Sequence, residues 1–224
     1  MNIFRLVADL MHLASIGILL LKIQKTRSCV GNVTITNFVL GAGISFKSQL
    51  LYAIVFCTRY VDLLTSYISL YNSTMKLFFI GSSLYIVYLI KLKFRATHDP
   101  SIDTFKIEFL LGGAAILGAL FPYKYTVIEI LWAFSVWLEA VAILPQLFML
   151  QRTGEAETIT THYMFAMGAY RALYLLNWIY RYFAEGHIDW IVWIAGIVQT
   201  AIYSDFAYIY VTRVLKGKKF ELPK

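Results

Sequence analysis

Most of this chain consists of long apolar runs separated by short polar turns. A transmembrane helix needs roughly 20 predominantly apolar residues, because the hydrocarbon core of a bilayer is about 30 Å thick. On that basis the sequence predicts seven spans, at residues 3–21, 49–68, 75–92, 104–121, 125–143, 161–183 and 188–213. These spans take up nearly the whole chain. We therefore expect an all-α membrane protein with a single seven-helix transmembrane domain over residues 1–224.

The composition supports a lipid-embedded fold. Apolar residues make up 59% of the 224 residues and charged residues 15%, against roughly 45–50% and about 25% in soluble proteins. Cys29 and Cys57 lack the spacing of a zinc or redox motif, and Asp9 with His12 is too sparse for a metal site. No HExxH, GxSxG or GxGD motif occurs. We expect no metal, no cofactor and no enzymatic activity.

The distribution of basic residues predicts the orientation in the membrane. Cytoplasmic loops carry an excess of Lys and Arg, and one side of the predicted topology has little beyond Lys76, Lys124 and Arg181. The side that contains the C-terminus carries Lys22, Lys25, Arg27, Lys47, Lys91, Lys93, Arg95, Arg152, Arg213, Lys216, Lys218, Lys219 and Lys224. We therefore predict a cytosolic C-terminus and a lumenal or extracellular N-terminus. The net charge of +7 follows from this topology and does not indicate nucleic-acid binding.

Several spans carry ionisable and polar residues that the topology does not explain. A charge at the bilayer centre costs about 2.5–3.5 kcal/mol on insertion scales, so such residues are expected to face one another or a water-filled cavity. The residues concerned are Arg5, Asp9, His12, Arg59, Asp62, Glu129, Trp132, Glu139, Tyr170, Arg171, Tyr174, Asn177, Trp178, Arg181 and Asp205. One interpretation is that pairs such as Arg59 with Asp62 only neutralise each other within one helix. The concentration of such residues favours a shared polar cavity, which their depths place open to the lumen.

The residue types predict the ligand of this cavity. Guanidinium groups bind carboxylates bidentately, and three arginines at graded depth (Arg5, Arg59 and Arg181) suit an anionic, extended ligand. The rings of Trp132 and Trp178 offer amphipathic walls. Asp62 and Glu129 could meet a positive group on the same ligand. A short acidic peptide with a free C-terminus fits this set of groups.

The sequence resembles the KDEL receptors, which retrieve escaped endoplasmic-reticulum proteins, nearly from end to end. The resemblance is carried by MNIFRL, KSQLL, TRYVDL, ISLYNSTMK, EILWAFS, LEAVAILPQLFML, TGEAETITTHY, YRALYLLNWIYRY, GIVQT and VTRVLKGKK. It implies a fold like that of the SWEET and PQ-loop transporters, with two three-helix bundles joined by a linking helix. Pro145-Gln146 resembles the PQ signature of the second bundle.

The resemblance also implies the ligand and its site. The ligand would be the C-terminal Lys/His-Asp-Glu-Leu tetrapeptide of lumenal proteins, with its terminal carboxylate on Arg59. The other matching residues of the binding site are Arg5, Asp62, Glu129, Trp132, Tyr174, Asn177, Trp178 and Arg181.

Binding in this family is tighter in the mildly acidic Golgi, and His12 matches its pH sensor. Histidine has an ordinary pKa of about 6.5, so a ligand that prefers the protonated ring binds more tightly at low pH. Glu139 and Tyr170 match the hydrogen-bonded pair through which closure is relayed, and Arg171 is adjacent. A histidine that only packs beside Asp9 is the alternative interpretation.

The tail at residues 214–224 contains Lys216, Lys218 and Lys219, which match the lysines that recruit the COPI coat for return to the endoplasmic reticulum. An ordinary positive-inside flank is the alternative interpretation. Glu221 lies where some relatives have a phosphorylatable serine. The resemblance therefore implies a multi-pass protein of Golgi, endoplasmic reticulum and transport vesicles.

Residues 30–41 form an insertion that the family lacks. This insertion is predicted to lie in the first cytosolic loop, far from the lumenal cavity, so we expect peptide binding to survive it. The main alternative function is a SWEET-like small-solute transporter, because a fold does not fix a function. Such a carrier requires a cavity that opens to each side in turn.

Overall fold

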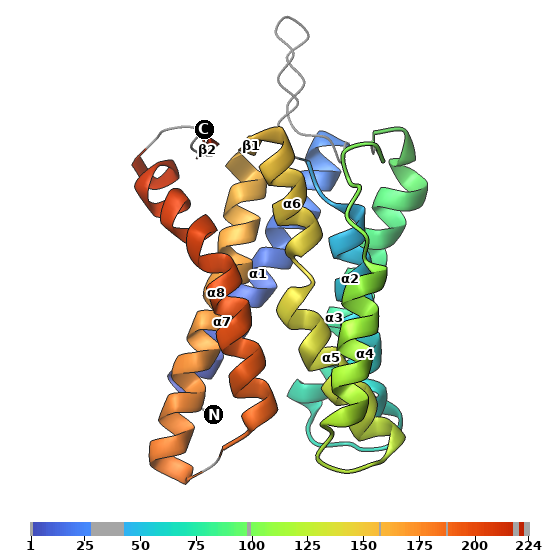
Figure 1. Ribbon diagram of the computed structural model, residues 1–224, viewed down its shortest axis with the longest axis vertical. Helices are drawn as coiled ribbons and strands as arrows, with labels where there is room; N and C mark the ends of the chain where they lie inside the picture. The colour runs from blue at the N-terminus through green and yellow to red at the C-terminus, as the bar shows by residue number, and fades with distance from the viewer. Residues whose placement is uncertain are drawn as a thin grey trace, which may run out of the picture. The chain divides into compact units, whose positions relative to one another are not determined.

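The computed structural model describes residues 2–27, 43–97, 100–156, 158–186, 188–216 and 220–221 (Figure 1). The described residues are helical almost throughout and belong to two compact units, Met1–Ile44 with Phe148–Lys224 and Ser45–Leu147. The predicted insertion at residues 30–41, together with Lys218 and Lys219 of the predicted coat-binding tail, lies outside the described residues. The prediction of one domain over residues 1–224 stays a prediction.

The first unit is built around the long helix α7. Its elements are α1 (Ile3–Thr26), the C-terminal part of α6 (Leu144–Thr153), β1 (Glu155–Ala156), α7 (Thr158–Glu185), α8 (Trp190–Thr212), η4 (Val214–Lys216) and β2 (Phe220–Glu221). Helix α7 packs against both α1 and α8, as Figure 1 shows in orange, blue and red. The two short strands are antiparallel, with Glu155 opposite Glu221, so the end of the chain is paired with the turn that precedes α7.

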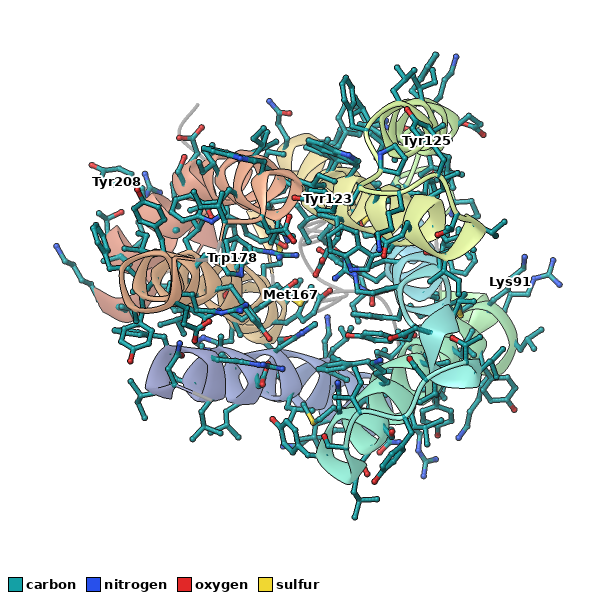
Figure 2. The ribbon with its side chains drawn as sticks, turned by 90° about the horizontal axis from the view of Figure 1, so that it is seen from below. Lys91, Tyr123, Tyr125, Met167, Trp178 and Tyr208 are labelled. Carbon is teal, nitrogen blue, oxygen red and sulfur yellow. The ribbon has the colours of Figure 1, made fainter. Side chains whose placement is uncertain are left out.

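The second unit is built around α2 and α5. Its elements are α2 (Phe46–Arg59), η1 (Val61–Leu64), α3 (Leu70–Tyr88), η2 (Leu89–Lys93), η3 (Arg95–Thr97), α4 (Glu108–Leu120) and α5 (Val127–Val141). Helix α2 packs on α3 and α5, and α5 also packs on α4. Figure 2 shows Lys91 and Tyr125 pointing outward, and both side chains are exposed.

Side-chain caps fix where five of these helices begin. A capping side-chain oxygen accepts a hydrogen bond from one of the backbone N–H groups that the first turn leaves without a helical partner. These caps are Asn2 for α1, Ser45 for α2, Ser69 for α3, Thr126 for α5 and Asp189 for α8.

A buried polar network holds the start of α2. Ser45 Oγ donates to both carboxylate oxygens of Asp103 at 3.0 Å, and the backbone N–H of Lys47 donates to Asp103 Oδ2 at 3.1 Å. The N–H of Ser45 donates to Gln146 Oε1 at 2.8 Å, and the N–H of Gln146 donates to Ser48 Oγ at 3.0 Å. The network therefore joins the start of α2 to the segment before α4 and to the start of α6.

The prediction of an all-α membrane protein is confirmed, and each of the seven predicted spans contains a described helix. Four described helical stretches are long and apolar enough to cross a membrane: Ile3–Lys25, Leu70–Lys93, Val127–Thr153 and Trp190–Lys216. Helix α2 has 14 residues and α4 has 13, which correspond to only about 20 Å of helix each. Helix α7 has 28 residues and is long enough to cross a membrane, but it is not among these four apolar stretches and carries the charged residues described below.

The predicted boundary at residue 68 is wrong, because α2 ends at Arg59. The chain instead turns at Asp62, whose backbone carbonyl accepts hydrogen bonds from the N–H groups and hydroxyls of Thr65 and Ser66. Ser and Thr side chains that bond to nearby backbone compete with helix formation.

The fifth predicted span is followed directly by a second helix. Helix α5 ends at Val141, and α6 begins at Leu144. Pro145 lies in the first turn of α6, where a residue without an N–H is tolerated, but it cannot donate the bond that would continue α5. The break therefore follows from the PQ sequence itself, with Gln146 held in the network around Asp103.

Substitution of Gly118 by alanine is expected to destabilise the second unit. A Cβ at this position of α4 would lie 2.7 Å from the backbone N and Cα of Phe134 in α5, and backbone atoms cannot move aside as a flexible side chain can. Overpacking of this kind costs about 1–3 kcal/mol. Thermal unfolding of the protein in detergent measures the loss. The matched control is Gly113→Ala in the same helix, where nothing lies within 4 Å; equal effects of the two substitutions would contradict the prediction.

Candidate functional site

The predicted binding residues divide between the two units. The first unit contains Arg5, His12, Tyr170, Arg171, Tyr174, Asn177, Trp178, Arg181 and Lys216. The second unit contains Arg59, Asp62, Glu129, Trp132 and Glu139. We call these sets the α1/α7 cluster and the α2/α5 cluster. Lys216 is left out of the first set because it lies in η4, beyond the end of α8, and is exposed.

Polar side chains join α1 to α7 within the α1/α7 cluster. The Tyr174 hydroxyl donates to Asp9 Oδ1, and Asn2 Nδ2 donates to Asn177 Oδ1 at 2.7 Å. Arg5 Nε lies 4.0 Å from Asp9 Oδ2, and the Arg5 side chain is 48% exposed. Arg5 is therefore only loosely held by Asp9, and its guanidinium group is accessible.

The middle of the cluster is a stack of rings and a cation. The His12 ring lies parallel to the Tyr170 ring, with 4.1 Å between centroids and 3° between planes. The Arg171 guanidinium lies 5.5 Å from the Tyr170 centroid and 5.9 Å from that of Trp178, within cation–π range. His12, Tyr170 and Arg171 are all buried. The predicted pH sensor therefore contacts the predicted relay residue Tyr170 directly.

Helix α8 supports this arrangement through a glycine. A Cβ at Gly196 would clash with the Trp178 ring, so the absence of a side chain lets the indole lie against α8. Trp178 and Met167 lie among the packed side chains of the unit in Figure 2, whereas Tyr208 lies at its outer edge.

Arg181 and Asp205 do not join the packed part of the cluster. Arg181 Nε donates to Glu185 Oε2 at 2.7 Å, one turn further along α7, and both side chains are at least one-third exposed. Asp205 lies on an exposed face of α8. Arg181 is thus placed as an accessible cation near the end of α7.

The α2/α5 cluster is centred on Arg59. Its Nε donates to Ser135 Oγ at 3.1 Å, its Nη2 donates to the Ser135 carbonyl at 3.0 Å, and its Nη1 donates to Glu139 Oε2. The side chain of Arg59 is 16% exposed and that of Glu139 is 2% exposed. The guanidinium plane is therefore fixed by α5.

The alternative interpretation that Arg59 and Asp62 neutralise each other is wrong. Arg59 pairs with Glu139 instead, and Asp62 Oδ2 accepts a 2.6 Å bond from Lys76 Nζ of α3. In the sequence, Lys76 is only one of the few cations on the less basic side of the predicted topology, and nothing in its local pattern points to Asp62. Ser135 has no sequence signal either, because a serine in an apolar helix is common.

The remaining members of this cluster lie at the start of α5. The backbone N–H of Glu129 donates to the Thr126 cap at 3.3 Å, so its carboxylate is in the first turn, where a negative charge is favoured. The Trp132 ring lies 6.1 Å from the Tyr123 ring. Both Glu129 and Trp132 are partly exposed and are available to a ligand.

Each cluster lies within one unit, so the hypothesis that the two clusters form a single cavity stays a prediction, as does the pairing of Glu139 with Tyr170. No group of three or more His, Cys, Asp or Glu side chains in the described part of the chain is placed to hold a metal ion. The helices carry arginines, carboxylates and aromatic rings, which are groups suited to binding an ionic ligand.

The fold and these clusters define an all-helical membrane protein with ionic binding groups on its helices, and sequence comparison identifies the family. Residues 41–181 match the family model described as "ER lumen protein retaining receptor". The chain is 60% identical to the ER lumen protein-retaining receptor 2 of Gallus gallus, 59% to that of Homo sapiens and 57% to the ER lumen protein-retaining receptor of Drosophila melanogaster. Each comparison extends over 223 residues and covers 100% of both chains. This chain belongs to the ER lumen protein retaining receptor family.

Proposed function

We propose that this protein is a retrieval receptor that binds the C-terminal Lys/His-Asp-Glu-Leu signal of lumenal proteins in the Golgi and returns them to the endoplasmic reticulum. Family membership and the names of the full-length relatives support this function. The observation that carries it is Arg59, a largely buried guanidinium whose plane is held by the three hydrogen bonds that it donates to α5. Such a group is preorganised to bind a terminal carboxylate.

The other residues take roles that follow from their chemistry. The exposed guanidiniums of Arg5 and Arg181 attract the acidic peptide before it reaches Arg59. Asp62 and Glu129 hold the cationic first residue of the signal. The rings of Trp132 and Trp178, with the polar atoms of Tyr174 and Asn177, line the path between these ends.

The terminal carboxylate and Glu139 compete for the same guanidinium. Arg59 Nη1 is occupied by Glu139 Oε2 in the structure, so a bidentate peptide carboxylate on Arg59 displaces the Glu139 contact. A released Glu139 is then free to engage Tyr170, which links ligand capture to a change in the protein. This change lets Lys216, Lys218 and Lys219 of a cytosolic tail recruit the COPI coat, with the N-terminus in the lumen.

His12 supplies the pH dependence in this proposal. Its ring is stacked on Tyr170 and lies one helical turn from Asp9, so a bound anionic ligand favours the protonated form. If the bound state holds this proton more tightly than the free state does, affinity is full at low pH and is lost as pH rises through the ordinary histidine range near 6.5. Cargo is then bound in the Golgi and released in the endoplasmic reticulum.

Substitution of His12 by alanine is expected to remove most of this pH dependence. Binding of a Lys-Asp-Glu-Leu tetrapeptide, measured by calorimetry between about pH 5 and about pH 7.5, should weaken by about tenfold across the range in the wild type and by less than about threefold in His12→Ala. The matched control is His162→Ala, because His162 lies on the same helix α7 as the cluster but bonds the Tyr210 hydroxyl at 2.5 Å instead. Unchanged pH dependence in His12→Ala would refute the role of His12. Saturable uptake of sugars by vesicles containing the protein would instead favour a transporter.

A further inference from the structure

Lys76 and Asp62 form an ion pair at the edge of the α2/α5 cluster. Lys76 Nζ lies 2.6 Å from Asp62 Oδ2, and the side chain of Lys76 is 10% exposed. The same ammonium group lies 5.8 Å from the centroid of the Tyr60 ring. Asp62 itself is held by the turn after α2, where its carbonyl accepts bonds from Thr65 and Ser66. Both members of the ion pair are therefore fixed in place.

No described residue donates a hydrogen bond to the second carboxylate oxygen of Asp62. Oδ1 is buried and has no partner among the described residues. A carboxylate has about four acceptor sites, and buried polar atoms in native structures nearly always have a partner, so each exception needs an explanation. An oxygen of this kind beside a fixed lysine indicates a position for a further donor.

We propose that Lys76 is a specificity-determining residue that sets how strongly this receptor prefers lysine over a neutral residue at the first position of the retrieval signal. This inference rests on the proposed function. The side chain of Asp62 is 31% exposed, and a small rotation of its carboxylate presents Oδ1 to the first side chain of the ligand while Oδ2 stays with Lys76. Lys76 therefore weakens the attraction of Asp62 for a second cation, both by neutralising the carboxylate and by direct repulsion.

The effect depends on the charge of the first residue of the peptide. A lysine in this position is always charged at neutral pH and is repelled by Lys76. A histidine is mainly neutral near pH 7.4 and can donate to Oδ1 without that repulsion. An alanine neither donates nor is repelled. Lys76 thus reduces the preference for lysine over alanine at the first position of the signal. At neutral pH it does not disfavour histidine at that position.

The test compares three N-acetylated tetrapeptides, Lys-Asp-Glu-Leu, His-Asp-Glu-Leu and Ala-Asp-Glu-Leu, so that only the first side chain differs in charge. Each is measured on the full-length wild type and on Lys76→Met at about pH 7.4 and about pH 5.5. A unit charge removed about 5–6 Å from a partly buried cation changes affinity by about tenfold or more. The ratio of lysine-peptide to alanine-peptide affinity should therefore rise by about tenfold in Lys76→Met at both pH values. The ratio of histidine-peptide to alanine-peptide affinity should rise in Lys76→Met at about pH 5.5 and change little at about pH 7.4. Comparing ratios at one pH removes any contribution of His12.

Three further variants separate charge from structure. Lys76→Arg keeps the charge and should leave the lysine ratio near the wild-type value. In the double variant Lys76→Met with Asp62→Asn, the ratio of lysine-peptide to alanine-peptide affinity should fall close to one. The matched control is Lys124→Met, which removes an exposed lysine predicted on the same side of the membrane and should shift all three peptides alike. Where Lys76→Met lowers the yield of folded receptor, Lys76→Gln removes the same charge and retains a donor for Oδ2.

The outcomes distinguish this inference from the proposed function. A lysine ratio in Lys76→Met and Lys76→Gln within about twofold of the wild type, with the alanine peptide still bound, overturns the role of Lys76 alone. A wild type that binds none of the three peptides overturns the proposed function and this inference with it.

Discussion

Substitution of Arg59 by alanine is expected to reduce the affinity for a Lys-Asp-Glu-Leu tetrapeptide by at least about 100-fold, equivalent to about 2.7 kcal/mol. A peptide carboxylate in a largely desolvated site makes charge-assisted hydrogen bonds to the guanidinium group. Truncation of one partner in such a buried pair costs about 2–5 kcal/mol. Calorimetry measures the loss.

Arg59 also has a structural role that must be separated from binding. The substitution removes the counter-ion of Glu139, whose side chain is 2% exposed, and removal of one partner of a buried ion pair destabilises a protein by about 3–5 kcal/mol. The double variant Arg59→Ala with Glu139→Gln removes both charges and should recover thermal stability without recovering binding. Arg59→Lys keeps a positive charge but loses the planar fork, so it should bind weakly. Affinity within about threefold of the wild type in Arg59→Ala would contradict the assignment of the carboxylate to this residue.

Substitution of Asp103 by leucine is expected to lower the free energy of unfolding by about 3 kcal/mol. The side chain of Asp103 is buried, and its loss leaves the Ser45 hydroxyl and the Lys47 N–H without their acceptor. A buried donor left without a partner costs about 1–3 kcal/mol, and the negative charge beside the first turn of α2 is lost as well. Thermal or denaturant unfolding in detergent measures the change.

Two substitutions calibrate this effect. Asp103→Asn keeps an acceptor oxygen and should cost less than Asp103→Leu. Asp189→Ala removes an N-cap of α8, whose Oδ1 accepts from the Val192 N–H at 3.1 Å, and should cost about 1 kcal/mol. If Asp103→Leu is no more destabilising than Asp189→Ala, then the hydrogen-bond network around Asp103 is not the main stabilising contact at the start of α2.

The helical content and the helix positions could be predicted from the sequence, but the end of α2 could not. Residues 49–68 are mostly apolar, and hydropathy alone does not reveal that the helix stops at Arg59. The break between α5 and α6 has a local cause in Pro145, which is a sequence signal for a helix break as well as part of the PQ signature.

The residues of the α1/α7 and α2/α5 clusters could be selected from the sequence as candidates, since buried ionisable residues in membrane spans are functional candidates, and their role in binding stays a prediction. Their partners were not. The spacing of Arg59 and Asp62 suggested that they pair with each other, whereas Arg59 pairs with Glu139, 80 residues away, and Asp62 pairs with Lys76. Partner choice depends on which helix faces pack together, which local spacing does not specify.

By itself the sequence determined that this chain forms membrane helices and which of their side chains are costly to bury, because the free energy of transfer into lipid is a property of each residue and its neighbours along the chain. Only the tertiary structure decided that His12 stacks on Tyr170 and that the Arg59 plane is fixed by Ser135 and Glu139. It also decided that one oxygen of Asp62, beside Lys76, has no donor among the described residues. These contacts join residues on different helices, and their geometry exists only once the helices have packed.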